Sequence, residues 1–186
     1  MFREDRAASL AGFFVEKAGG NLEFIKLMKL MYFAERKYLI ERGVTMTGDS
    51  FFSMDNGPVL SYAWDCMNPK SKNRVMKLGA TWRNFVSTVT GGRVYRKADG
   101  AEIRFTPAQT VLLTKIWEDY GWRSEEDLIE LSHKLPEWEK PTNSESILIK
   151  FKTVIDSSDM PAEEKQSKLR RVMVKRNIDS FFADVG

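Results

Sequence analysis

The chain has 186 residues, of which 42% are hydrophobic and 12% aromatic, so it can bury a sizeable core and is not expected to be disordered. Lysine and arginine number 29 against 26 aspartate and glutamate residues, and the net charge of +3 excludes a strongly cationic surface. With 1 cysteine and 1 histidine, the chain cannot form an internal disulfide and lacks the ligands for a structural zinc site, so no metal or cofactor is expected.

Two helices are predicted at the start of the chain. Between residues 6 and 17 apolar side chains recur at helical spacing, and Gly19-Gly20 then ends this helix. The second helix is predicted over residues 21–42, with Asn21 as its N-cap and Gly43 just past its end.

The second predicted helix separates into two halves when its residues are rotated by about 100° each. One half is apolar and is expected to face the core. The other half, here called the basic stripe, mixes cations with large apolar residues: Lys26, Lys29, Arg36 and Lys37, with Leu30, Phe33 and Ile40 among them. A solvated face does not need these apolar side chains, so either a neighbouring helix covers part of the stripe or the stripe meets an acidic partner.

Glu35 lies within the apolar half of the same helix, between Phe24 and Met28. A buried carboxylate requires a partner. We expect a salt bridge to an arginine or lysine from a distant segment, or access to water at the edge of the domain. A catalytic role would require a second polar group beside Glu35, and the sequence does not identify one.

Residues 48–89 are predicted to form a series of short elements. A β-prone segment is predicted over residues 48–54, and Asn56-Gly57-Pro58-Val59 then marks a fixed change of chain direction. A short helix is predicted over residues 62–67, ending in the polar loop 68–73. Residues 75–89 are predicted to form a further helix.

A hairpin and two capped helices are predicted after this. Residues 93–97 and 102–105 read as the two strands of the hairpin. Thr106-Pro107-Ala108-Gln109 combines a capping box with proline at the first helical position, so a helix is predicted to run to Tyr120 and end at Gly121. Ser124-Glu125-Glu126-Asp127 caps another predicted helix, which ends near His133 before Pro136.

The last part of the chain is predicted to end in a long amphipathic helix. Residues 140–146 are expected to form a loop, and residues 147–155 fit either a helix or a strand. In the final helix, apolar residues follow helical spacing on one side, and the other side carries Lys165, Lys168, Arg170, Arg171, Lys175 and Arg176. These cations suit phosphate binding, but acidic residues flank them and no aromatic side chain lies among them, so a solvated face is the favoured interpretation.

The sequence contains none of the common catalytic motifs: no phosphate-binding glycine loop, serine nucleophile elbow or zinc-protease helix. Because His133 is the single histidine of the chain, it would have to serve as the imidazole acid or base of any catalytic site. Asp127 and Glu130 precede it by about two turns and one turn, so we interpret it as a salt-bridged or hydrogen-bonded histidine at a helix C-terminus. No enzymatic activity is therefore expected, and an enzyme that uses Glu35 and His133 is the least favoured alternative.

The chain is expected to be cytoplasmic and to make no membrane contact. Residues 1–6 show no signal-peptide pattern, and no run of about 18 apolar residues occurs. The predicted fold class is mainly α (α+β): a compact helical domain over residues 1–186 with a small β-hairpin and short strands.

Three stretches carry a resemblance to a known family. Residues 27–34 read Leu-Met-Lys-Leu-Met-Tyr-Phe-Ala, residues 51–59 are an aromatic segment that runs into Gly-Pro-Val, and residues 120–138 contain Leu-Ser-His followed by a tryptophan. In order and spacing they resemble the Panacea domain, also called SocA-like, of antitoxins from bacterial and phage toxin-antitoxin loci. The motif residues are Leu27, Leu30, Tyr32, Ala34, Gly57, Pro58, Val59, Tyr120, Gly121, His133 and Trp138.

The resemblance implies an antitoxin of a type II toxin-antitoxin system, which neutralises a cognate protein toxin, encoded by an adjacent gene, by direct binding. It implies a Panacea-like core over residues 10–138, with residues 140–186 as a helical extension adapted to one partner. Members often have an aromatic or basic residue where this chain has Asn56, so the contacts of this turn are expected to be particular to this protein.

The residues expected to contact the partner lie on the basic stripe, the turn and the last helix: Lys26, Lys29, Phe33, Arg36, Lys37, Asn56, Arg170, Arg171 and Lys175. Two other functions stay open from the residues alone. One is a DNA-binding autorepressor that contacts operator DNA through the last helix. The other is an adaptor that presents the bound toxin to a protease.

Overall fold

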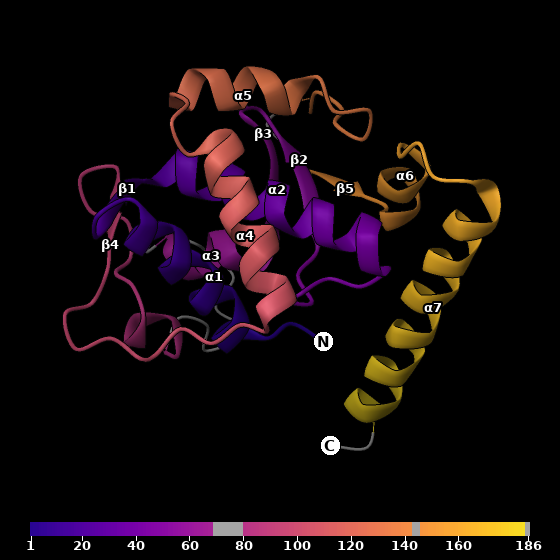
Figure 1. Cartoon of the computed structure of the whole chain (residues 1–186), viewed down its shortest axis with the longest axis horizontal. Helices are drawn as coiled ribbons and strands as arrows, with labels where there is room; N and C mark the ends of the chain where they lie inside the picture. The colour runs from indigo at the N-terminus through magenta and orange to yellow at the C-terminus, as the bar shows by residue number, and fades with distance from the viewer. Residues whose placement is uncertain (69–79, 143–145, 185–186) are drawn as a thin grey trace.

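One helix, α2 (Phe24–Arg42), runs through the middle of the fold and contacts most of the other elements. In the computed structural model, which describes residues 1–68, 80–142 and 146–184, helix α4 lies in front of α2 and α5 lies above it (Figure 1). Much of α2 is buried, including Leu27, Met31 and Ala34, all 0% exposed. The apolar half of this helix therefore faces the core, as its periodicity predicts.

Seven α-helices and one 3₁₀ turn account for most of the described residues. The α-helices are α1 (Glu4–Lys17), α2, α3 (Ser61–Met67), α4 (Pro107–Tyr120), α5 (Glu125–His133), α6 (Phe151–Asp156) and α7 (Ala162–Asp184), and the 3₁₀ turn is η1 (Trp82–Asn84). Together with two small antiparallel sheets, they confirm the predicted fold class, mainly α with a small β part.

The two sheets join segments that are distant in sequence. In the first, β1 (Asn21–Glu23) pairs with β4 (Arg93–Tyr95). In the second, β2 (Phe51–Met54) lies between β3 (Gly57–Leu60) and β5 (Ile147–Ile149). Strand β3 is at the edge of its sheet, where the missing N–H group of a proline costs no ladder hydrogen bond.

The capped helices follow their predicted bounds because their signals are local. Thr106 and Gln109 form both bonds of the capping box that begins α4, and Ser124 and Asp127 form the same pair of bonds at the start of α5. Gly43 adopts the left-handed conformation at the C-cap of α2.

Three predictions between residues 21 and 105 are wrong. Asn21 is not a helix N-cap: it belongs to strand β1, where its side chain accepts a hydrogen bond from Arg93 Nε at 2.7 Å, and α2 begins three residues later. The predicted hairpin does not form, because β4 pairs with β1 and residues 101–106 contain no strand. Of the helix predicted over residues 75–89, the part from residue 80 onward contains only the 3₁₀ turn, and residues 75–79 lie outside the described residues.

The ambiguous segment at residues 147–155 contains both of the predicted alternatives, since strand β5 ends at Ile149 and helix α6 begins at Phe151. Within the described part of the chain, none of the helices is both long and apolar enough to span a membrane.

Candidate functional site

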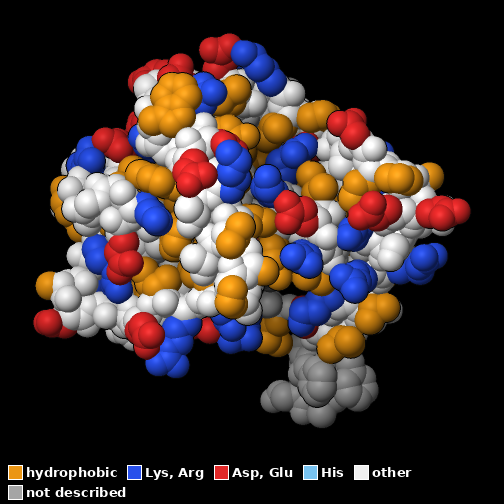
Figure 2. Space-filling model, viewed as in Figure 1, with side chains coloured by type: hydrophobic (Ala, Val, Ile, Leu, Met, Phe, Trp, Pro, Cys, Tyr) orange, Lys and Arg blue, Asp and Glu red, His pale blue; other side chains and the backbone are white. Residues whose placement is uncertain are grey.

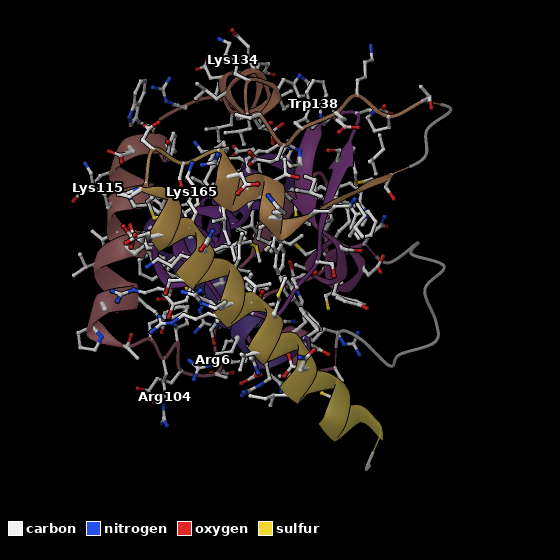
Figure 3. The ribbon with its side chains drawn as sticks, turned by 90° about the vertical axis from the view of Figure 1, so that its right-hand side faces the viewer. Arg6, Arg104, Lys115, Lys134, Trp138 and Lys165 are labelled. Carbon is white, nitrogen blue, oxygen red and sulfur yellow. The ribbon has the colours of Figure 1, made fainter. Side chains whose placement is uncertain are left out.

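The three motif stretches meet at the tip of the β2–β3 hairpin, residues 54–58. Lys29 Nζ, from α2, donates a hydrogen bond to the carbonyl oxygen of Pro58 at 3.0 Å. Trp138 Nε1 donates to the carbonyl oxygen of Met54 at 3.1 Å, and Figure 3 shows this residue beside the hairpin. The motif side chains therefore hold the backbone of the hairpin tip from two sides.

His133, the last residue of α5, also contacts the hairpin tip. Its Nε2 lies 3.1 Å from the carbonyl oxygen of Asp55, and its ring stacks on Trp138 with 3.9 Å between centroids and 16° between planes. Burial lowers the pKa of His133, which favours the neutral ring. The predicted hydrogen bond of this histidine exists, but its partner is the Asp55 backbone. Glu130 pairs with Lys134 instead.

Gly57 is required at the hairpin tip for two reasons. Its φ of 92° lies in the left-handed region that side-chain-bearing residues rarely adopt. A Cβ atom at this position would lie 2.7 Å from Lys29 Nζ and even closer to Ser132 Oγ. The glycine of the Gly-Pro-Val motif thus lets α2 and α5 approach the hairpin closely.

Lys29 is enclosed by this arrangement, with only 1% of its surface exposed. Burial lowers the pKa of Lys29 from 10.5 to about 7, because a desolvated ammonium group is unfavourable and no carboxylate within the described residues forms an ion pair with it. Ser132 beside it is 0% exposed and donates to the carbonyl oxygen of Ile129 at 2.8 Å. Both side chains are therefore buried, and Lys29 holds the hairpin through the Pro58 carbonyl oxygen.

A buried carboxylate, Glu137, ties α2 to the segment that follows α5. Glu137 is 4% exposed and accepts hydrogen bonds from the Tyr32 hydroxyl at 2.8 Å and from Arg36 Nε at 2.6 Å. The Arg36 guanidinium also donates to Ser157 Oγ, at the end of α6, at 2.9 Å. From its sequence, the basic stripe is expected to be covered by a neighbouring helix or to meet an acidic partner. For Arg36, the acidic partner is Glu137 of the same chain.

Glu35 has a different partner from the expected one. It is 0% exposed, and its carboxylate accepts the backbone N–H groups of Met46 and Thr47, each at 2.7 Å, and the Thr47 hydroxyl. The predicted salt bridge to a distant arginine or lysine is wrong, because the loop that follows α2 folds back and supplies neutral donors. Burial nevertheless raises the pKa of Glu35.

A second buried carboxylate, Asp49, lies close to Glu35. It accepts the backbone N–H groups of Tyr62 and Ala63, both at 2.9 Å, at the start of α3, and that of Ser50 at 2.7 Å. Burial raises the pKa of Asp49 from 3.8 to about 7. Both of these carboxylates hold loop and helix backbone, which is a structural arrangement.

Comparison with known families identifies the class of the chain. The family described as Antitoxin SocA-like, Panacea domain, matches residues 27–139, which is more than half of the chain. The chain belongs to the Panacea family. Its membership supports an antitoxin role in general terms. A search of curated proteins and a search of solved structures each found no match.

A groove on the Panacea scaffold lies between α2, α4 and α5, beside the motif residues. It encloses about 440 Å³, and its apolar lining includes Phe33, Ile40, Ile116, Leu131 and Leu135. Its charged lining residues are Arg36, Lys37, Glu41 and Asp119. This groove, here called the α2–α4–α5 groove, contains four members of the predicted basic stripe.

The predicted contact residues are distributed over three places. Lys29 is 1% and Phe33 6% exposed, because α4 and α5 cover this part of the stripe, and the Phe33 ring packs against Tyr120 at 4.8 Å. Lys26 and Lys37 are half-buried, and Asn56 is exposed in the hairpin turn. Arg170, Arg171 and Lys175 are exposed on α7, far from the turn in sequence.

Several important residues were not identified from the sequence. Glu137 directly precedes the motif residue Trp138, and this position was the only sequence signal for it. Ser132 belongs to the Leu-Ser-His stretch of the motif. Asp49 and Leu135 gave no signal, because their importance depends on which distant elements pack against them.

Proposed function

We propose that the chain is the antitoxin of a type II toxin-antitoxin pair, and that it neutralises its protein toxin by direct binding and without catalysis. Family membership over residues 27–139 is the observation that carries the proposal. The packing around the motif residues supports it, because Lys29, Ser132 and Glu137 are all buried and bond to backbone or to other side chains.

The α2–α4–α5 groove is the surface that we assign to the toxin. Ile40, Leu131 and Leu135 are half-buried and line it, so a large apolar side chain from a partner would gain further burial there. Interfaces depend most on a few anchors that fill such desolvated pockets. Lys37 lines the groove and forms no ion pair within the described residues, so it suits an acidic group near that anchor.

Co-expression with the product of the adjacent reading frame tests the proposal. We expect rescue of growth and recovery of the two proteins as one complex. Ile40→Gln, in the groove, is expected to weaken the complex about tenfold or more. Val111→Gln is the matched control, because Val111 is 71% exposed on α4 and does not line the groove. Absence of both rescue and complex formation would contradict the proposal.

Two further measurements separate the alternative roles. An autorepressor would bind the DNA upstream of its gene with a steep dependence on salt concentration. A protease adaptor would cause turnover of the bound toxin in cells instead of stoichiometric inhibition. Stable toxin levels together with full rescue would support neutralisation by binding.

A further inference from the structure

The outward side of helix α7 carries an unusual group of exposed apolar side chains. Met173, Val174 and Ile178 are 64%, 57% and 46% exposed. Single exposed apolar residues are common on proteins, but a contiguous group is typical of an interaction site. Together with Arg170, these three residues form what we call the α7 outer face.

The inner side of α7 is fixed against the end of α2, which determines where the outer face points. Lys168 Nζ donates to the carbonyl oxygen of Glu41 at 2.6 Å, and Arg171 Nη1 donates to that of Arg42 at 3.3 Å. These cations satisfy carbonyl groups at the negative end of the α2 dipole. A Cβ atom on Gly43 would lie 2.8 Å from the carbonyl oxygen of Lys168, so the two backbones are in close contact.

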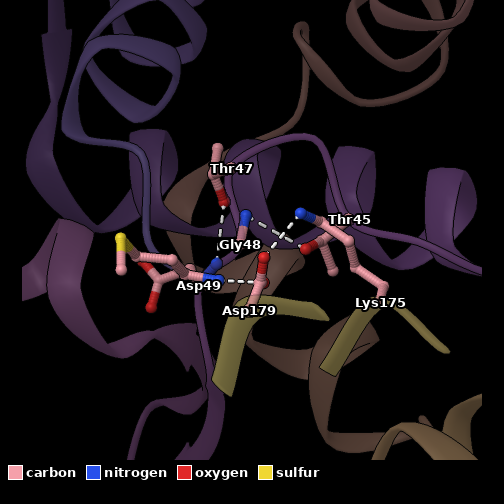
Figure 4. A network of polar contacts seen from close by, with 7 residues as sticks. Thr45, Thr47, Gly48, Asp49, Lys175 and Asp179 are labelled. Carbon is pink, nitrogen blue, oxygen red and sulfur yellow. Dashed lines mark hydrogen bonds and ion pairs between the residues drawn. The ribbon is translucent and has the colours of Figure 1, made fainter. Parts of the chain in front are cut away.

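A second anchor holds the C-terminal part of α7. Asp179 forms ion pairs with the amino-terminal ammonium group and with Lys175, the latter at 2.7 Å (Figure 4). Val172 is 8% exposed on the same inner side. The outer face therefore points away from the core, and Figure 3 shows α7 crossing the surface and extending past the other elements at its C-terminal end.

The sequence that carries the outer face is basic. The segment from Arg170 to Ile178 contains four lysine and arginine residues and no carboxylate. Arg170 forms no ion pair with any residue that the structure describes. In Figure 2, Lys, Arg and hydrophobic side chains lie together over the lower part of α7, while Asp and Glu side chains lie nearer its N-terminal end.

We propose that the α7 outer face binds an acidic amphipathic helix of the protein partner, in an inference that rests on the proposed antitoxin function. The apolar side chains of that helix would pack on Met173, Val174 and Ile178, and a flanking carboxylate would pair with Arg170. This face lies outside residues 27–139, so it can determine partner choice without altering the Panacea scaffold.

The same features disfavour two other occupants. Duplex DNA would place its charged phosphate backbone against Met173, Val174 and Ile178. The phosphates would then lose hydration without gaining a polar partner, and the three side chains would gain no apolar contact. A second copy of the chain would bring two cationic faces together, and this repulsion opposes a symmetric dimer.

A peptide probe tests the chemistry of the face directly. The probe is a labelled helical peptide of about 18 residues with leucine along one side and glutamate on both flanks, and the matched peptide carries lysine in place of glutamate. The full chain is expected to bind the glutamate peptide, more weakly as salt is raised, and not the lysine peptide. Equal binding of the two peptides, or of neither, would overturn the proposal.

Substitutions on the face then locate the binding. The triple variant M173Q/V174Q/I178Q and the single variant Arg170→Glu are each expected to weaken peptide binding about tenfold. Glutamine is a good helix former, so α7 should remain helical by circular dichroism. Val111→Gln and Lys97→Glu are the matched controls, since both alter exposed side chains on other elements and should leave affinity unchanged. Unchanged affinity in the face variants would also overturn the proposal.

The same variants distinguish this inference from the proposed function when tested against the toxin. If the unmodified chain neutralises the toxin and both face variants do so equally well, the inference fails and the antitoxin function stands. If the unmodified chain does not bind the adjacent gene product, the antitoxin function fails, and the peptide measurement still decides what the face binds. A dimer that the triple variant abolishes, or DNA binding that Arg170→Glu alone abolishes, would assign the face to one of the other occupants.

Discussion

The hydroxyl group of Tyr32 donates a hydrogen bond to Glu137 Oε1 at 2.8 Å, although the two residues are 105 positions apart in the chain. Arg36, one turn further along α2, donates to the same oxygen at 2.6 Å. A single buried carboxylate thus fixes the central helix to the segment that carries Trp138, whose indole N–H group holds the hairpin tip.

Glu137→Ala is expected to lower the free energy of unfolding by about 3–5 kcal/mol, because the Arg36 charge and the Tyr32 hydroxyl lose their buried acceptor. Urea unfolding measures the change. Glu139→Ala is the matched control, since Glu139 is exposed and only its backbone contacts Ser53. A loss below about 1 kcal/mol in Glu137→Ala would show that water replaces the carboxylate and that the connection is weak.

Gly57→Ala is expected to disrupt the hairpin tip. The new methyl group would meet Lys29 and Ser132 in a backbone conformation that alanine rarely adopts, so we expect a loss of about 3 kcal/mol or more in unfolding free energy. Gly91→Ala separates the two causes, because Gly91 also has a positive φ but no atom lies within 4 Å of the added Cβ. Equal losses in the two variants would mean that backbone conformation alone explains the requirement for glycine at position 57.

The parts of the fold that were predicted correctly depend on residues close together in sequence. The capping boxes at Thr106 and Ser124 and the glycine that ends α2 act within one turn of a helix, so their residues alone determine them. The apolar half of α2 could also be predicted locally, because apolar residues at helical spacing form one face that must be buried, whichever element covers it.

The incorrect predictions concern contacts between distant segments. The strand at residues 93–95 has the composition of a hairpin arm, but its partner is β1, some 70 residues earlier in the chain. Lysine is usually exposed, so the sequence predicts Lys29 at the surface. Only the packing of α5 and the hairpin against α2 explains its burial. Glu35 required a partner, and the loop after its own helix provides it.

Asp49→Ala is expected to loosen the start of α3. The carboxylate accepts the N–H groups of Tyr62 and Ala63, so its removal leaves these two donors without their acceptor and should cost about 1–3 kcal/mol. Hydrogen exchange measures the local effect, and faster exchange is expected at these two amides. Asp55→Ala, which alters an exposed carboxylate in the hairpin turn, should leave their exchange unchanged.

Lys29 makes the stability of the chain depend on pH above neutrality. Burial lowers the pKa of Lys29 in the folded chain to about 7, whereas the ordinary value of 10.5 applies when the chain unfolds. Between these two values the unfolded chain binds a proton at this position and the folded chain does not. The free energy of unfolding is therefore expected to rise from pH 7 to pH 10, by up to about 1.4 kcal/mol per pH unit. This contribution is lost as pH falls back to about 7, below which Lys29 is protonated in both states.

Lys29→Met tests this dependence because methionine fills a similar volume without a titratable group. The variant is expected to show a nearly flat unfolding free energy over the same pH range, measured by urea unfolding at several pH values. Its hairpin tip loses the hydrogen bond to the Pro58 carbonyl oxygen, so a constant offset between the two curves is also expected. Lys37→Met is the matched control, since Lys37 is half-buried on the same helix, and it should keep the alkaline rise. A slope that persists in Lys29→Met would assign the pH dependence to another group and would mean that the buried lysine keeps its charge.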